Sequence, residues 1–376
     1  MHPPLAFYLL EKRDKVGRGG EVTRGGRALR IGSKITIGYV PLIDCAPLVV
    51  ALEMGLFKKW GFDVHLSPEP GWATIRGKIV YEELDFAQAV CGLPLVLNYG
   101  LKSIPYRCST AFVLNLNGNA ITLSKKYSSI LENEPFENYG RILKATSALP
   151  LLFGVASTFS SHYFLLLRWL QKIGLNPQKD IRFVPLPPPQ MPLHLKEGFI
   201  DGFCVGEPWN SVSLFEKTGY CVATSLDLAP RHPEKVLLAN AKYKERKREE
   251  HIRIVGSLIE ACQWADSPLN RQALAEMLHY GGWIAQPLEV LRHSLIGPFR
   301  MGKNIFIPGQ AFHVFSQGNA NSPSKEKEQW IVNEMVDAGV LKIGERKNQS
   351  FFDPEIYKQA EKIVAQQKAN TLPISI

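Results

Sequence analysis

Apolar and polar positions form alternating strand-like and helix-like blocks from residue 34 onward. KITIGYV (34–40) is rich in β-branched residues and stops at a proline, which predicts a strand. CAPLVVALEMGLFKKWG (45–61) has helical spacing and closes at a glycine, and FDVHLSPEP (62–70) predicts a second strand. WATIRGKIVYEE (72–83) predicts a helix, and LDFAQAVCGLPLVLNYG (84–100) predicts a strand followed by a helix. This alternation predicts an α/β fold with a largely parallel sheet.

A second α/β unit is predicted from residue 151, with strands at LLFGVAST, DIRFVPLPPP, DGFCVGEPW and KTGYCVATSL and an amphipathic helix at SSHYFLLLRWLQKIGL. Residues 120–123 and 220–225 are the candidate crossings between the units, and the chain after 242 is mainly helical. We therefore predict lobe 1 at 34–122, lobe 2 at 123–222, and a return to lobe 1 with C-terminal helices at 223–376. Two such lobes enclose a cleft, into which the carboxyl-terminal ends of the strands point.

Composition fits this prediction and excludes other classes. With 376 residues and 45% hydrophobic residues, the chain is long enough for two domains. No apolar run approaches the roughly 18 residues that span a bilayer. The six cysteines lie mostly in apolar runs without a CxxC pair, which indicates buried packing in a reducing compartment rather than a zinc site. We expect no metal and no cofactor.

The first 33 residues have a different composition. Up to Lys34 the chain has eight Lys/Arg against three Asp/Glu, a net charge of +5 out of the chain's +9. We expect residues 1–33 to be a disordered basic tail, with weak nucleic-acid contact or a misplaced gene start as alternatives. LAFYLL is too short for an export signal, which favours a cytoplasmic protein.

Several candidate residues lie at predicted strand and helix ends. Trp72 carries one indole donor on a rigid plate, although a loop tryptophan also covers cores. Asn119 in LNLNGNA offers an amide, although Asn-Gly is first of all turn chemistry. His162 lies in the first turn of a helix that Ser160 or Ser161 caps, where anions are favoured, although a lone histidine there is more often structural.

The stretch DGFCVGEPWN is a predicted strand and its exit into the cleft. Gly206 allows close backbone approach, so its amide can donate to a ligand. Glu207 is either a ligand contact or a buried acceptor that pairs with Lys235 or His162, and Trp209 is a structural plug beside the site. Lys235 in HPEK is an ordinary exposed lysine when taken alone.

Taken together, GWATIRGK, LNLNGNAITL, FSSHYFLLLRWLQKIGL, VPLPPPQM, DGFCVGEPWN and HPEK resemble the nitrate- and bicarbonate-binding proteins of the type II periplasmic-binding-protein superfamily. The resemblance covers residues 34–357 and implies a two-lobed, non-enzymatic protein that closes on one small anion. It places Trp72, Asn119, His162, Gly206 and Lys235 at the ligand, with Ser161, Glu207 and Trp209 around them. The family's arginine is shifted here, so Arg168 is assigned no ligand role.

The resemblance favours nitrate, with nitrite as a second ligand. Nitrate accepts hydrogen bonds only and needs a cation and donors, which this set supplies. Bicarbonate has an O–H and is better served by an acidic group or a metal; bicarbonate-binding relatives place an acid where Lys235 stands. A protonated His162 would strengthen binding, so we expect affinity to fall as pH rises through its pKa.

Asn119 and the absence of a glycine-rich insert after the Trp72 helix resemble the cytosolic nitrate sensor that holds an ANTAR-type RNA-binding antiterminator inactive. The sensor is therefore our first hypothesis, with no direct nucleic-acid binding expected. The alternatives are the solute-binding component of an ABC importer, exported to the periplasm, an organic-anion receptor, and an enzyme. No GxSxG motif or carboxylate pair supports a hydrolase.

Overall fold

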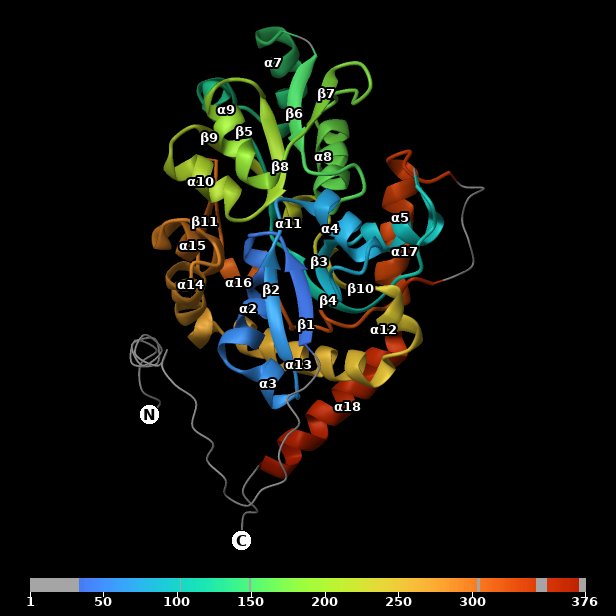
Figure 1. Ribbon diagram of the computed structural model, residues 1–376. Coiled ribbons are helices and arrows are strands. Elements are labelled where there is room, and N and C mark those ends of the chain that lie inside the picture. Colours follow the sequence, from blue (N-terminus) through green and yellow to red (C-terminus); the bar gives the residue numbers. More distant parts are fainter. Residues whose placement is uncertain (1–33, 102, 149, 303–304, 343–349, 372–376) are drawn as a thin grey trace.

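The computed structural model describes residues 34–101, 103–148, 150–302, 305–342 and 350–371. The basic tail predicted at 1–33 lies outside these residues. The chain forms two lobes, each built on its own sheet: the second lobe is at the top of Figure 1 and the first lies below it. No helix in the described ranges is both long and apolar enough to cross a bilayer.

The sheet of the first lobe has the strand order β13-β4-β10-β3-β1-β2. These strands are β1 (Lys34–Tyr39), β2 (Asp63–Pro68), β3 (Phe86–Val90), β4 (Ser109–Asn117), β10 (Pro233–Ala239) and β13 (His313–Val314). β1 runs parallel to β2 and β3, whereas β10 is antiparallel to β3 and β4. The prediction of a largely parallel sheet is therefore wrong for this half, because the strands that leave and re-enter the lobe run against their neighbours.

The sheet of the second lobe has the order β7-β6-β8-β5-β9. Its strands are β5 (Asn119–Ser124), β6 (Leu151–Val155), β7 (Ile181–Pro185), β8 (Gly202–Gly206) and β9 (Gly219–Thr224). The predicted crossings at 120–123 and 220–225 lie in β5 and, except for Ser225, in β9, which pair antiparallel within this sheet. The chain passes from the first sheet to the second between β4 and β5 and returns between β9 and β10, and the predicted lobe boundaries stay predictions.

Helices cover both sheets. In the first lobe they are η1 (Ile43–Cys45), α2 (Ala46–Glu53), α3 (Leu56–Lys59), α4 (Trp72–Val80) and α5 (Leu93–Tyr99). In the second lobe they are η2 (Lys125–Tyr127), α6 (Ser128–Leu131), η3 (Phe136–Asn138), α7 (Tyr139–Thr146), α8 (Ser161–Lys172), η4 (Pro188–Gln190), α9 (Met191–Lys196), α10 (Trp209–Phe215) and α11 (Ser225–Leu228). The C-terminal part adds α12 (Ala241–Glu245), α13 (Arg248–Asp266), η5 (Pro268–Asn270), α14 (Arg271–Tyr280), α15 (Leu288–Leu295), the pair β11 (Phe299–Met301) and β12 (Ile305–Ile307), α16 (Gly309–Phe312), α17 (Lys325–Asp337) and α18 (Pro354–Thr371).

One predicted helix is broken. The apolar run at 45–61 forms two helices, because Gly55 between them has a left-handed φ of 69°. A glycine adopts that conformation without steric cost and ends α2, which lets α3 turn back against the sheet.

Among the described residues, the apolar side chains form three large cores and a small one around Phe299 and Phe312. One joins the first sheet to α2, α13 and α18, and a second lies under the second sheet against α8. The third large core contains Leu42 and Trp72 of the first lobe together with Phe203 and Val205 of the second. Apolar packing is therefore continuous between the lobes, beside the ends of α4 and β8 (Figure 1). All six cysteines are buried and free, as their apolar surroundings predicted.

Candidate functional site

An irregular start of β10 brings two opposite charges into the space between the sheets. The register of β10 against β4 shifts between Pro233 and Lys235. Successive strand residues normally point to opposite faces, but Glu234 and Lys235 form an ion pair and are both fully buried. Bulges commonly re-aim a side chain in this way. The HPEK sequence therefore supplies the site with a carboxylate as well as an ammonium group.

Lys235 contacts residues from both lobes. Its Nζ lies 2.9 Å from Asp44 Oδ2 and 3.3 Å from His162 Nε2. It also lies 5.0 Å from the centre of the Trp72 ring, which is a cation–π distance. The ammonium group is thus enclosed by η1, the start of α4 and the start of α8. This burial explains why the usual expectation for a lone loop lysine, exposure to solvent, fails here.

Asp44 is a second charged partner of Lys235, and nothing in the sequence pattern around it indicates this role. The Gln88 amide on β3 donates to Asp44, and Gln88 Oε1 accepts from the backbone N–H of Val40 at 2.9 Å. Burial raises the pKa of Asp44 to about 6, against the opposing effect of Lys235. The carboxyl group therefore changes charge within the range of ordinary physiological pH.

The first turn of α8 carries two polar side chains into the site. Ser160 is the N-cap and its hydroxyl accepts from the backbone N–H of Tyr163 at 3.3 Å, which confirms one of the two predicted caps. The next residues, Ser161 and His162, are fully buried. The Ser161 hydroxyl donates to Glu234, and His162 Nε2 lies 2.9 Å from Glu234 Oε1. The positive end of the helix dipole adds to the attraction for negative charge here.

Asn119 and Gly206 face one another across β5 and β8. The amide nitrogen of Asn119 donates to Glu234, and a Cβ built on Gly206 would lie 3.3 Å from Asn119 Oδ1 and 3.3 Å from Asp44 Oδ2. A glycine at this point therefore keeps the backbone close to the polar groups of the site. A side chain here would press on these groups and on Leu42, whose Cδ2 lies 3.0 Å from the same Cβ position, and the predicted ligand contact of the Gly206 amide stays a prediction.

Glu234 is at the centre of the cluster. Its carboxylate accepts from Lys235, His162, Asn119 and Ser161, and from His232 Nε2 at 2.9 Å. Burial alone would raise the pKa of Glu234, but Lys235 and His162 outweigh it and hold that pKa well below its usual range. Sequence reasoning missed both Glu234 and His232, although they stand beside Lys235 in HPEK. A strand pattern places neighbours on opposite faces, so only the bulge reveals them.

Three polar atoms of the predicted ligand residues are left over. Among the described residues, the buried indole nitrogen of Trp72 has no hydrogen-bond partner, and the same holds for His162 Nδ1 and Asn119 Oδ1. The two rings are 5.6 Å apart. A buried indole N–H without an acceptor is costly, so this corner is suited to a small polar ligand.

His162 differs from the sequence expectation in its titration. Burial lowers its pKa, and the nearby charge of Lys235 lowers it further, while Glu234 acts in the opposite direction. The histidine therefore favours the neutral form in this conformation. Anion affinity was expected to fall as pH rises through the pKa of His162. Because that pKa is lowered, the fall is expected at a lower pH than for an unperturbed histidine.

Glu207 is a buried acceptor, but the prediction that it pairs with Lys235 or His162 is wrong. Its carboxylate accepts from Ser211 Oγ and, at 2.6 Å, from Ser294 Oγ, which ties α10 to α15. Burial raises the pKa of Glu207. The chain turns from β8 into α10 here, so Glu207 contacts the C-terminal helices and not the cluster around Lys235.

Ser211, Glu207 and His293 superficially resemble a hydrolase triad. His293 Nδ1 lies 2.8 Å from Ser211 Oγ, but its Nε2 accepts from the backbone N–H of Arg300 at 3.1 Å. In the neutral ring, Nδ1 therefore carries the proton and donates to the serine, so it is no base for that hydroxyl. Ser211 is also fully buried. The arrangement is structural.

Two further residues fall outside the cluster. Trp209 begins α10 and is buried in the core that also holds Trp72, which fits its predicted role as a plug. Arg168 on α8 binds Glu334 of α17, with Nε 3.0 Å from Oε2 and a second bond from Nη2. It connects the second lobe to the C-terminal part.

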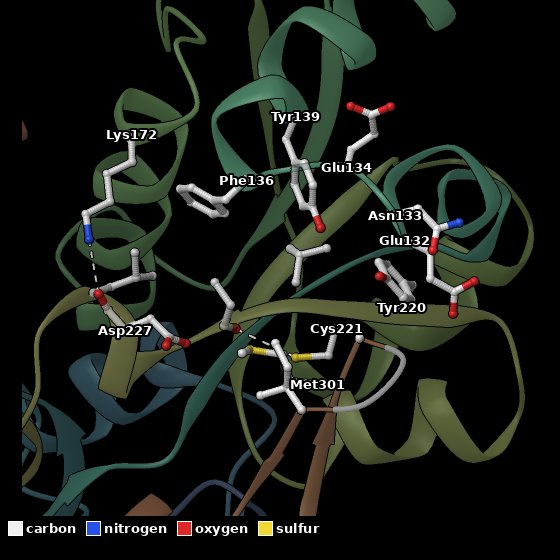
Figure 2. A pocket seen from close by; sticks show the side chains of 15 residues that line it. Glu132, Asn133, Glu134, Phe136, Tyr139, Lys172, Tyr220, Cys221, Asp227 and Met301 are labelled. Atoms are coloured by element: carbon white, nitrogen blue, oxygen red, sulfur yellow. Dashed lines mark hydrogen bonds between the residues drawn. The ribbon is translucent and has the colours of Figure 1, made fainter.

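The predicted ligand residues line none of the described cavities. Figure 2 shows one of about 570 Å³ between the second lobe and the β11–β12 pair. Its lining includes Glu132, Glu134, Phe136, Tyr139, Lys172, Tyr220 and Asp227. The Lys172 ammonium turns toward the Asp227 backbone oxygen, 3.1 Å away (Figure 2). The three carboxylates make this open cavity unsuitable for an anion, whereas the cluster around Lys235 is closed.

Comparison with known proteins bears on this arrangement. A model of the NMT1-like family matches residues 32–279. The chain belongs to the NMT1-like family. Among curated relatives, the nitrate import ATP-binding protein NrtC of Synechocystis sp. is 36% identical over 304 residues, which are 80% of this chain and 45% of NrtC. The bicarbonate transport ATP-binding protein CmpC of Synechococcus elongatus is 32% identical over 302 residues, 80% of this chain and 44% of CmpC.

This NMT1-like chain thus spans less than half the length of both relatives. Among solved structures, the periplasmic nitrate-binding protein NrtA from Synechocystis PCC 6803 superposes with a TM-score of 0.77 at 23% identity, covering 91% of this chain and 90% of NrtA. That likeness confirms the two-lobed periplasmic-binding-protein fold. The nitrate/bicarbonate-binding resemblance drawn from the sequence is confirmed at the level of the family.

Proposed function

We propose that the protein binds nitrate or nitrite between its lobes as the solute-binding component of an ABC-type importer. One observation supports the proposal: Trp72 and His162 contact the buried Lys235 ammonium group, and Asn119 and Gly206 lie beside its acidic partners Glu234 and Asp44. Relatives named for nitrate import and nitrate binding support the same ligand. Binding is non-enzymatic and uses no metal.

The chemistry of the donors favours an anion that accepts hydrogen bonds. Lys235, His162, Asn119 and the unpartnered Trp72 indole offer a charge and N–H groups at the edges of a planar ion. Bicarbonate is the competing ligand, since its O–H can donate to Asp44 or Glu234 and one relative is named for bicarbonate transport. The sequence argument against bicarbonate relied on Lys235 standing in place of an acid, whereas the structure has two acids beside it.

Isothermal titration of the purified protein with nitrate, nitrite and bicarbonate, with and without calcium, tests the proposal. We expect binding of nitrate or nitrite that Lys235→Glu abolishes. Lys58→Glu, the same charge change on an exposed residue of α3, should bind like the wild type. If the protein binds only bicarbonate, its role is in bicarbonate uptake. If it binds none of the three anions, the proposed anion site is refuted.

The second candidate is a cytosolic nitrate sensor that controls an ANTAR-type antiterminator. Asn119 and the short connection between α4 and β3 at residues 81–85 support it, because both resemble sensor members of the family. Lobe closure can release a partner only by as much as the ligand's affinity differs between the two states. Nitrate-dependent dissociation of an antiterminator complex, with the protein in the cytoplasmic fraction, would favour the sensor; a periplasmic location would favour the importer.

A further inference from the structure

The donors assigned to the ligand are already engaged by the chain itself. Lys235, His162, Asn119 and Ser161 all bond to the carboxylate of Glu234, which is fully buried. A carboxylate is planar, carries one negative charge and presents two acceptor oxygens, so it offers the same hydrogen-bonding edge as nitrate or nitrite. In this conformation the side chain takes the place that the anion needs.

The charges in the cluster leave no room for an additional anion. Asp44 and Glu234 are the acids, and Lys235 Nζ bonds to both. His232 also contacts Glu234, with its Nε2 2.9 Å away, and its Nδ1 lies 3.0 Å from the Ala229 carbonyl oxygen. The Lys235 ammonium group is thus shared between two acids. A further anion would add an uncompensated buried charge, which costs several kcal/mol.

We propose that Glu234 is an internal competitor of the ligand: a small planar anion binds when the Glu234 carboxylate gives up Asn119, Ser161, His162 and Lys235. The inference rests on the proposed function and adds the residue that sets its affinity. The ligand then gains donors that are already positioned, including the unpartnered indole of Trp72, and loses the energy needed to displace Glu234. Affinity is therefore lower than the donor set alone would give.

Glu234→Ala and Glu234→Gln test this, with formate as a probe because it is a free carboxylate. We expect Glu234→Ala to bind nitrate or nitrite at least tenfold more tightly than the wild type by calorimetry. Formate should bind Glu234→Ala and not the wild type. Glu234→Gln keeps the shape without the charge, so it should also bind nitrate or nitrite more tightly and remains informative if the alanine variant does not fold.

Asp44→Asn is the matched control. It removes one negative charge beside Lys235 without releasing the donors that Glu234 holds. If charge alone sets affinity, Asp44→Asn and Glu234→Gln will tighten nitrate binding equally and formate will bind none of the variants, which overturns the inference. Displacement requires formate binding in Glu234→Ala only.

The outcomes separate this inference from the proposed function. If the wild type binds nitrate and both Glu234 variants bind it more weakly, Glu234 supports the site, and the inference fails while the function stands. If neither the wild type nor a variant binds nitrate or nitrite but formate binds Glu234→Ala, Glu234 is confirmed as an internal competitor and the proposed nitrate-binding function is refuted. Circular dichroism and thermal unfolding establish that each variant is folded.

Discussion

Replacing Lys235 with methionine tests whether the central lysine holds the site together as well as binding the ligand. The side chain is fully buried, and its ammonium group pairs with Asp44 at 2.9 Å and with Glu234. Methionine keeps the length and apolar stem but leaves both acids without their shared cation. Removing one partner of a buried ion pair typically costs about 3–5 kcal/mol, because the remaining charge is uncompensated.

The two acids differ in what they retain. Glu234 keeps His162 and His232, whereas Asp44 keeps only the Gln88 amide among its described hydrogen-bond partners. We therefore expect Lys235→Met to cost about 3–5 kcal/mol of unfolding free energy at pH 7, mostly through Asp44. Adding Asp44→Asn should recover about half of that cost, and neither variant should bind nitrate.

Urea unfolding followed by circular dichroism measures the four proteins of the double-mutant cycle at pH 7.5 and pH 5. Burial raises the pKa of Asp44 to about 6, so at pH 5 this group is largely protonated and its coupling to Lys235 should shrink. A cost below about 1 kcal/mol for Lys235→Met, or a coupling that does not change with pH, would refute this account of the buried pair.

Three further outcomes follow from the same geometry. Gly206→Val should weaken nitrate binding more than tenfold and cost about 1–3 kcal/mol of stability, because its side chain would push against Asn119 and Asp44; retained affinity in titration would contradict the close approach. Nitrate affinity should rise as pH falls through about 6, because protonation removes the charge of Asp44, and Asp44→Asn should flatten that dependence in titrations from pH 5 to 8. Arg168→Ala should destabilise the protein by about 1–3 kcal/mol in urea by leaving the buried Glu334 unpaired, with nitrate affinity changed less than threefold.

The sign of the Asp44 contribution to stability is opposite to that of an ordinary surface acid. Its folded-state pKa is raised, so the folded protein binds a proton more readily than the unfolded chain. The contribution is therefore most favourable below about pH 4 and is lost as pH rises through about 6. Glu234 acts in the other direction, because its depressed pKa gives stability that is lost in acid. Thermal unfolding of Asp44→Asn and of the wild type at pH 4.5 and 7.5 separates the stability contribution of Asp44 from that of Glu234.

Much of the fold could be predicted because periodicity and breakers act locally. The strand at KITIGYV, the capped helix after Ser160 and the strand that ends at Gly206 all follow from spacing, caps and glycine. The break at Gly55 and the antiparallel course of β10 were missed, because neither follows from a helical pattern or from strand alternation. Strand direction depends on which lobe the chain returns to, and that is a long-range property.

The sequence by itself determined the α/β elements, the buried cysteines and the ligand candidates from Trp72 to Lys235, since these depend on residue type, local spacing and family resemblance. Only the tertiary structure decided that Glu234 and Lys235 face the same point and that Asp44 and His232 join them. The physical reason is the shifted register of β10 against β4, which turns neighbouring side chains together. The tertiary structure also decided that Glu207 accepts hydrogen bonds from Ser211 and Ser294, because those contacts depend on how α10 packs against α15.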